Sequence, residues 1–121
     1  MTPLDNLYGN GLTVTAEPAA PGTLCLRLTG DLDHESADAL VRAVTARLGV
    51  RPAPRRLRLD CAGLTACDAL GLSAFLMIGR RTRAADCALH LDRTPPHLDR
   101  LLTVTGTRGY LVGPDEEPGP A

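Results

Sequence analysis

Residues 57–85 read LRLDCAGLTACDALGLSAFLMIGRRTRAA, and within this stretch the hydrophobic period changes from that of a strand to that of a helix. Residues 57–61 alternate apolar and polar side chains, which predicts a half-buried strand. Residues further on follow helical spacing in two neighbouring, mostly apolar lines, one formed by Leu72, Phe75, Leu76 and Gly79, the other by Leu70, Ala74, Met77 and, at its end, Arg81. The stretch therefore predicts a strand followed by a helix that is apolar on more than one face.

The residues before this stretch predict a hairpin and a first helix. Residues 12–17 and 23–29 alternate as strands do, and a short Pro/Gly segment between them favours antiparallel pairing. After Gly30 the period becomes helical. Asp33 is the expected N-cap of this helix, because its carboxylate can accept unpaired N–H groups of the first turn, and Gly49 is expected to end it.

The residues after this stretch repeat the alternation. Residues 87–91 predict a strand, and a helix is expected next, with Thr94 as its cap, Pro95 at its first position and Gly106 at its end. A last short strand is predicted at 110–112. The order β-β-α-β-α-β-α-β predicts an α/β domain with a mostly parallel or mixed sheet.

Composition limits the classes of function. The 121 residues suffice for one domain, and 13 basic against 14 acidic side chains give a formal charge of -1, which provides no general field for nucleic acid or an anionic membrane. One Phe, two Tyr and no Trp leave little for base stacking. No apolar run approaches the length of a membrane span and no signal peptide is recognisable, so we expect a cytoplasmic protein.

Catalytic and cofactor motifs are missing from the sequence. There is no glycine-rich nucleotide cradle, no G-x-S-x-G elbow and no paired histidines, so neither catalytic residues nor a cofactor or metal site is predicted. The four cysteines, at 25, 61, 67 and 87, form no CxxC pair and are expected to be free buried thiols. An enzyme using Asp68 with His34 is the weaker alternative, because it lacks a nucleophile.

Three segments in order resemble the STAS domain of anti-sigma factor antagonists: LCLRLTGDLDHESADAL at 24–40, LRLDCAGLTACDALGLSAFL at 57–76 and HLDRLLTVTG at 97–106. The resemblance implies a single STAS-like α/β domain with a four- to five-stranded mixed sheet and helices packed chiefly on one side. We place this domain at 12–113, between a flexible N-terminal arm at 1–11 and a flexible C-terminal tail at 114–121.

The resemblance also implies a partner, namely an anti-sigma factor of the serine-kinase ATPase type, whose capture frees a sigma factor. In that family the kinase phosphorylates the serine of a D-S-x-G motif. Here Asp68-Ala69-Leu70-Gly71 places a methyl group at the phosphoacceptor position, so this switch is expected to be missing. Ala69 is alternatively explained by helix propensity alone, and Thr65 and Ser73 are the nearby hydroxyls that would be substitute acceptors.

The expected partner-binding surface surrounds the start of the second helix and consists of Asp33, His34, Asp68, Ala69, Leu70, Ser73 and Met77. Exposure of Leu70 and Met77 would favour an apolar docking surface, whereas burial would make them ordinary core. The alternative hypothesis is a STAS scaffold that has lost the kinase and binds other STAS proteins or a second copy of itself.

Overall fold

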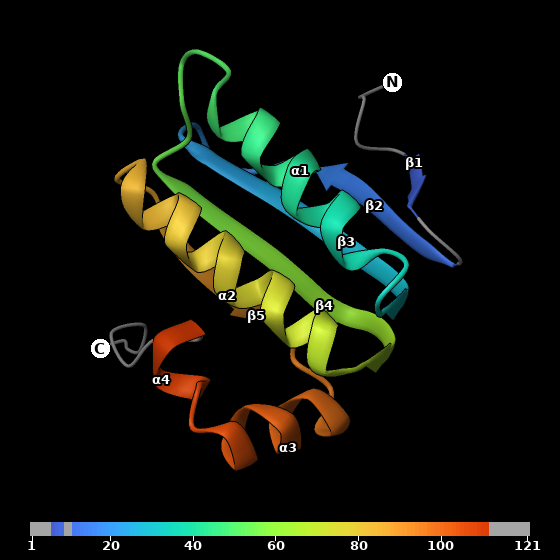
Figure 1. Cartoon of the computed structure of the whole chain (residues 1–121). Helices are drawn as coiled ribbons and strands as arrows, with labels where there is room; N and C mark the ends of the chain where they lie inside the picture. Colours follow the sequence, from blue (N-terminus) through green and yellow to red (C-terminus); the bar gives the residue numbers. More distant parts are fainter. Residues whose placement is uncertain (1–5, 9–10, 112–121) are drawn as a thin grey trace.

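The computed structural model describes residues 6–8 and 11–111. Nine elements follow one another along this part of the chain (Figure 1): β1 (Asn6–Tyr8), β2 (Leu12–Glu17), β3 (Thr23–Leu32), α1 (Ala37–Leu48), β4 (Arg56–Cys67), α2 (Ala69–Ala84), β5 (Ala88–Asp92), α3 (Pro96–Thr105) and α4 (Arg108–Leu111). Strand β1 falls inside the region expected to be a flexible arm, and the predicted tail at 114–121 lies outside the described residues.

The five strands form one mixed sheet in the order β1-β2-β3-β4-β5. Strands β1, β2 and β3 pair antiparallel, which confirms the hairpin, and β3, β4 and β5 pair parallel. The parallel pairs are linked through α1 and α2, as crossover connections require. The predicted α/β architecture with a mixed sheet is therefore confirmed.

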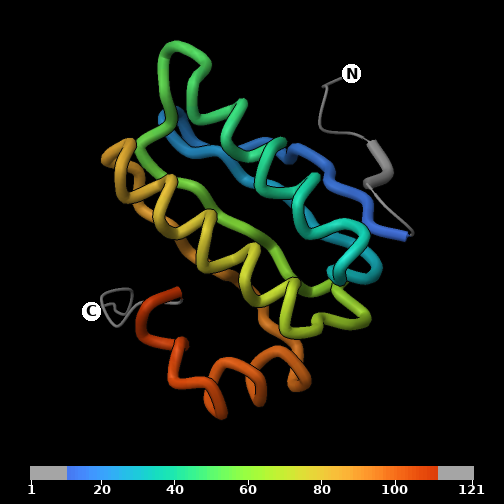
Figure 2. The backbone as a smooth tube through the Cα atoms, in the orientation of Figure 1, coloured from blue at the N-terminus to red at the C-terminus, as the bar shows by residue number. Residues whose placement is uncertain are grey.

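Helices α1 and α2 lie side by side over one face of the sheet (Figures 1 and 2). The alternation in the strands sends leucines to this face, where they meet the apolar sides of both helices. The core is almost entirely aliphatic, and its fully buried members include Leu26, Leu28, Leu32, Leu40, Val44, Leu57, Leu59, Phe75 and Ile78. Each such side chain stabilises the fold by roughly 1.5–3 kcal/mol relative to exposure.

Strands β3 and β4 are longer than predicted. Strand β3 continues to Leu32 and β4 to Cys67, with irregular pairing between Arg27 and Asp31. Gly30 lies in this irregular part with a φ of +104°, and a Cβ there would lie 1.7 Å from the Gly11 carbonyl oxygen. The small and polar residues of these extensions break the alternation of apolar and polar side chains. The strands predicted from that alternation therefore end before the strands of the structure do.

The predicted strand at 110–112 is wrong. Tyr110 belongs to the short helix α4, and Val112 lies outside the described residues. Helix α4 packs against α2: the Tyr110 ring meets the open side of Gly79, and the guanidinium carbon of Arg83 lies 4.4 Å from the ring centroid. The Tyr110 hydroxyl also accepts a 2.8 Å hydrogen bond from Arg83. These long-range contacts, which no local pattern carries, hold the segment as a helix.

The predicted cap of the first helix is also wrong. Helix α1 begins at Ala37 with Ser36 at the N-cap, and the Asp33 carboxylate instead accepts the Glu35 N–H at 2.9 Å in the turn before it. The buried Ser36 hydroxyl donates to the Asp31 carbonyl at 3.0 Å and accepts the Asp33 N–H at 3.1 Å. This polar turn occupies the residues at which the hydrophobic period of the sequence predicted the start of the helix.

The third predicted helix starts one residue later than expected. Pro96 is its first residue and Pro95 its N-cap, while the Thr94 hydroxyl donates to Asp99 at 2.6 Å and so caps no backbone group. The predicted ends at Gly49 and Gly106 are confirmed, and Gly106 has the left-handed conformation typical of that position.

The other face of the sheet carries an ion-pair network centred on Asp60. This carboxylate is only 7% exposed, binds Arg93 through two guanidinium nitrogens and lies 3.8 Å from Arg27. Burial raises the pKa of the Asp60 carboxyl, but hydrogen bonds from Arg93 and from the Ala62 N–H outweigh burial, so the pKa lies below its ordinary value. Folding thus favours the ionised form.

Asp60→Asn should lower the free energy of unfolding at pH 7 by about 1 to 3 kcal/mol, because Arg93 loses its charged acceptor and Arg27 keeps only its 3.1 Å ion pair with Glu17. Since the folded-state pKa lies below the unfolded value of 3.8, this stabilisation is present above that pH and is lost as the pH falls through the folded pKa. Urea unfolding at several pH values should show a steeper acid loss for the native chain than for the variant. Asp92→Asn, in the more exposed pair with Arg58, is the control; an equal effect there would contradict the central role of Asp60.

Gly71 allows the first turn of α2 to approach the end of β3. A Cβ at this position would lie 2.5 Å from the Leu32 carbonyl oxygen and 2.9 Å from the Cys67 sulfur. Gly71→Ala should therefore destabilise the domain by about 1 to 3 kcal/mol despite the better helix propensity of Ala. Gly109→Ala in α4 is the matched control, since nothing lies within 4 Å of a Cβ there. Equal unfolding midpoints for the two variants would refute the close approach.

Candidate functional site

The first turn of α2 is held in place by Asp68. Asp68 is the N-cap of α2: its carboxylate accepts the Gly71 N–H at 2.9 Å, and its own N–H donates to the Leu32 carbonyl at 3.3 Å. Leu72 is 7% exposed and points into the core. The two residues between cap and core, Ala69 and Leu70, are exposed. The cap thus leaves Ala69 and Leu70 at the surface.

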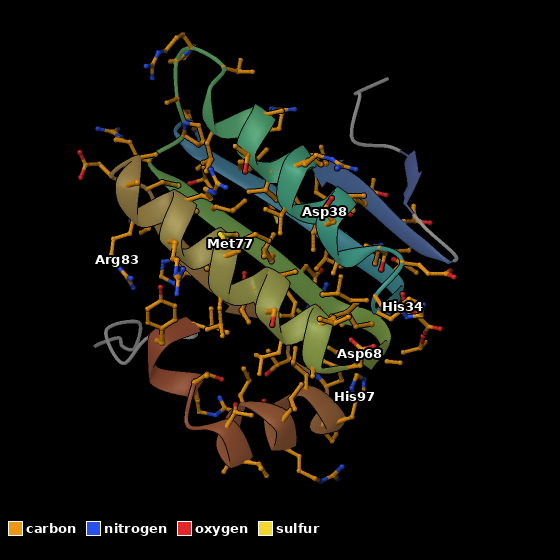
Figure 3. The ribbon with its side chains drawn as sticks, viewed as in Figure 1. His34, Asp38, Asp68, Met77, Arg83 and His97 are labelled. Carbon is orange, nitrogen blue, oxygen red and sulfur yellow. The ribbon has the colours of Figure 1, made fainter. Side chains whose placement is uncertain are left out.

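A groove runs between α1 and α2 from this turn toward the far end of α2. It has a volume of about 330 Å³ and is lined by His34, Ala37, Asp38, Val41, Leu70, Ser73, Ala74, Met77 and Arg81. Figure 3 shows His34 and Asp68 near one end of the two helices, with Asp38 and Met77 along them. The floor is apolar, and Leu70, the most exposed apolar residue of the groove, has a relative exposure of 52%.

The structure brings four of the seven predicted partner-binding residues into this groove, namely His34, Leu70, Ser73 and Met77. Asp68 and Ala69 lie directly before Leu70 at the start of α2, and Asp33 lies in the turn before α1. We define the docking surface as these seven residues together with the other residues that line the groove. Asp33 and Asp68 already bind backbone N–H groups, so their first contribution is to shape the turns.

Several groove residues were not predicted from the sequence. Arg81 and Ala74 stand in the second apolar line of the α2 segment, and that line was the available signal for them. Asp38 and Val41 come from α1. Nothing local distinguishes the side of α1 that meets α2 from the side that meets the sheet, so their place depends on the packing of the two helices.

The two hydroxyls near Ala69 have different surroundings. Thr65 is exposed at the end of β4 and donates a 2.5 Å hydrogen bond to the Asp31 carboxylate. Ser73 is exposed and lines the groove one turn into α2. Thr65 therefore sits against a negative charge, which disfavours a phosphate there, whereas Ser73 lies in the groove itself.

The groups that acid–base or thiol chemistry would need are engaged otherwise. His34 lies 3.8 Å from Glu35, and the Asp68 carboxylate caps α2. Burial, with a smaller contribution from Asp68, raises the pKa of the Cys67 thiol to about 12, so this thiol is protonated at neutral pH. Among residues 6–8 and 11–111, no group of three His, Cys, Asp or Glu side chains is arranged to hold a metal ion.

A larger hollow of about 510 Å³ lies at the opposite end of α1, in the loop that leads to β4. Prolines form much of its wall, together with Arg47, Val50 and Arg55. It contains none of the predicted site residues and no group suited to catalysis. We therefore place the candidate site at the docking surface.

Solved structures with the same fold include regulators and a transporter-family protein. An anti-sigma factor antagonist from Mycobacterium paratuberculosis has a TM-score of 0.68 at 19% identity, over 92% of this chain and 93% of that one. The Bacillus cell fate determinant SpoIIAA in its phosphorylated form has a TM-score of 0.65 at 19% identity, over 87% and 94%. A sulfate transporter family protein from Wolinella succinogenes has 0.67 at 16%, over 80% and 81%.

At these identities the likeness establishes the fold and not the partner. None of the curated proteins compared with the chain matches it. Within the described part of the chain, no helix is both long and apolar enough to cross a bilayer. The family model described as "Mlab, STAS domain" matches residues 15–113. This match spans most of the sequence, and the chain belongs to the STAS domain family.

Proposed function

We propose that the chain is an anti-sigma factor antagonist that acts by binding and not by catalysis. Its partner is an anti-sigma factor of the serine-kinase ATPase type in the cytoplasm, and its docking releases a sigma factor. The chain uses no cofactor and binds neither nucleic acid nor membrane. Solved anti-sigma factor antagonists with this fold support the proposal, as does the family membership.

The observation that carries the proposal is the exposure of Ala69 and Leu70 on a rigidly capped turn. Exposed apolar side chains beside a groove are typical of protein-binding surfaces. The cap by Asp68 and the close fit of Gly71 support the proposal that this turn is the counterpart of the family's D-S-x-G element, with Ala69 in place of the serine.

The missing hydroxyl changes the regulation. A phosphate on this turn would add nearly two negative charges to a surface that Ala69 and Leu70 make uncharged. Without an acceptor at 69, the kinase cannot release this chain by that reaction. We therefore propose that binding is constitutive, or is set by the abundance of the chain.

Leu70→Asp should weaken the complex with the anti-sigma factor by at least about tenfold, the equivalent of 1.4 kcal/mol, because a charge replaces a half-exposed apolar contact. The tagged full chain would first be used to isolate the anti-sigma factor from source cells, and the affinity would then be measured with purified proteins. Val50→Asp is the matched control, since Val50 is also 52% exposed but lies in the α1–β4 loop at the other end of α1. Equal loss for both variants, or recovery of only STAS proteins or a second copy of the chain, would favour the scaffold alternative instead.

Ala69→Ser should turn the chain into a kinase substrate. With the isolated kinase and ATP, the native chain should take up little phosphate and the variant close to one phosphate per chain, because the helix N-terminus tolerates the added charge. Phosphorylation of the variant should then weaken the complex by about one to two factors of ten. Intact-mass spectrometry gives the stoichiometry.

The opposite result is equally clear. If the native chain is labelled stoichiometrically, and Ser73→Ala or Thr65→Ala abolishes the label, the acceptor has moved and binding is not constitutive. If Ala69→Ser is not labelled while the complex forms, the turn at Asp68 does not present its side chain to the kinase.

A further inference from the structure

We propose that the groove between α1 and α2 binds one amphipathic helix of the partner, whose two ends carry opposite charges. This inference rests on the proposed function for the identity of the partner, but it specifies the chemistry of the bound segment. The proposed function requires of the partner only an apolar contact near Leu70. The groove further specifies the length of the bound segment, its apolar side and the charge at each of its ends.

The floor of the groove fits the apolar side of a helix. Val41 from α1 and Leu70, Ala74 and Met77 from α2 form it, and the α2 members repeat at helical spacing. From Leu70 to Arg81 the groove follows α2 over twelve residues, whose eleven steps of 1.5 Å span about 16 Å. Three turns of a bound helix match this length, with apolar side chains at i, i+4 and i+7 or i+8.

The end of the groove at the helix N-termini is acidic. Asp33, Glu35 and Asp38 precede or begin α1, and Asp68 caps α2. The positive ends of the two helix dipoles, each equivalent to about half a charge, and Arg42, bound to Asp38 at 2.6 Å, offset about half of these four charges. A basic side chain of the partner is therefore favoured at this end.

The other end of the groove is basic. Arg81 lines it, and Arg80 is its neighbour on α2, whereas Arg83 contacts Tyr110 of α4 and Arg47 lines the larger hollow at the C-terminal end of α1. The negative dipole end of α2, equivalent to about half a charge, offsets only part of the two positive charges of Arg80 and Arg81. An acidic side chain of the partner is favoured here. Because the two ends of the groove carry opposite charges, a helix with opposite charges at its ends should bind more tightly than a helix with the same charge at both ends.

Three synthetic peptides test the inference on the full chain. Each has fourteen residues and the same apolar face with leucines at i, i+4, i+7 and i+11; one carries lysines at one end and glutamates at the other, one lysines at both ends, and one glutamates at both ends. Their binding to the chain is measured by fluorescence anisotropy. Because reversal of a mixed helix in the groove restores the charge match, the comparison does not depend on the direction of binding.

The native chain should bind the mixed peptide about five times more tightly than either uniform peptide, as expected for exposed charge pairs worth up to about 1 kcal/mol. In Arg81→Glu the basic end loses its positive charge while the other end stays acidic, so the lysine-only peptide should gain on the mixed one and approach or overtake it. Arg100→Glu, on the exposed surface of α3 and outside the groove, changes the net charge equally and should leave the order unchanged. Met77→Asp should weaken all three peptides.

Equal binding of the three peptides, or the same shift of preference in Arg81→Glu and Arg100→Glu, would overturn the inference. Its failure is separable from that of the proposed function. If Leu70→Asp breaks the complex with the anti-sigma factor but Arg81→Glu does not change the order of peptide affinities, the proposed function stands and the helix in the groove is refuted. If the peptides bind in a charge-dependent way but no complex with an anti-sigma factor is found, the helix-binding groove stands and the proposed function is refuted.

Discussion

The contact between the first turn of α2 and the end of β3 determines the geometry of the whole docking surface. The Leu32 carbonyl accepts the Asp68 N–H, and only a glycine at 71 leaves room for that carbonyl beside the helix. The Asp68 carboxylate then closes the turn by accepting the Gly71 N–H. With the helix fixed at this point, Leu72 and Phe75 reach the core while Ala69 and Leu70 stay outside. This contact therefore accounts for both the aspartate and the glycine that flank Ala69 and Leu70.

The groove is a consequence of that placement. Parallel strands joined by α1 and α2 bring both helix N-termini to one end of the sheet and both C-termini to the other. Carboxylates are favoured at helix N-termini and arginines at C-termini, so two neighbouring parallel helices produce an acidic end and a basic end. The opposite face of the sheet is different, because its ion pairs around Asp60 satisfy one another and leave no apolar floor. The molecule therefore has one helical face suited to docking and one sheet face whose charges are balanced.

The sequence predicted the parts of this structure that local pattern controls. The change of period around Asp68 located β4 and α2, and the glycines at 49 and 106 marked helix ends. Contacts that the hydrophobic period does not encode account for the failures. Tyr110 is helical because it packs on Gly79 and Arg83, and Asp33 caps a turn because buried Ser36 occupies the helix start. At the site, the second apolar line of α2 indicated Arg81, whereas Asp38 and Val41 required the arrangement of the two helices. The expectation that Ala69 stands at the family's phosphoacceptor position comes from the resemblance and remains a prediction, which labelling of Ala69→Ser would test.

The central claim is that a protein partner covers the α1–α2 face around the start of α2. Hydrogen–deuterium exchange of the chain, free and saturated with its isolated anti-sigma factor, tests this claim most directly, because it maps the covered backbone without any substitution. The account predicts slower exchange in the turn before α1, in the first turns of α1 and along α2 from Asp68 to Arg81, with no change in the α1–β4 loop around Val50. Protection confined to that loop, or to the sheet face around Asp60, would contradict it.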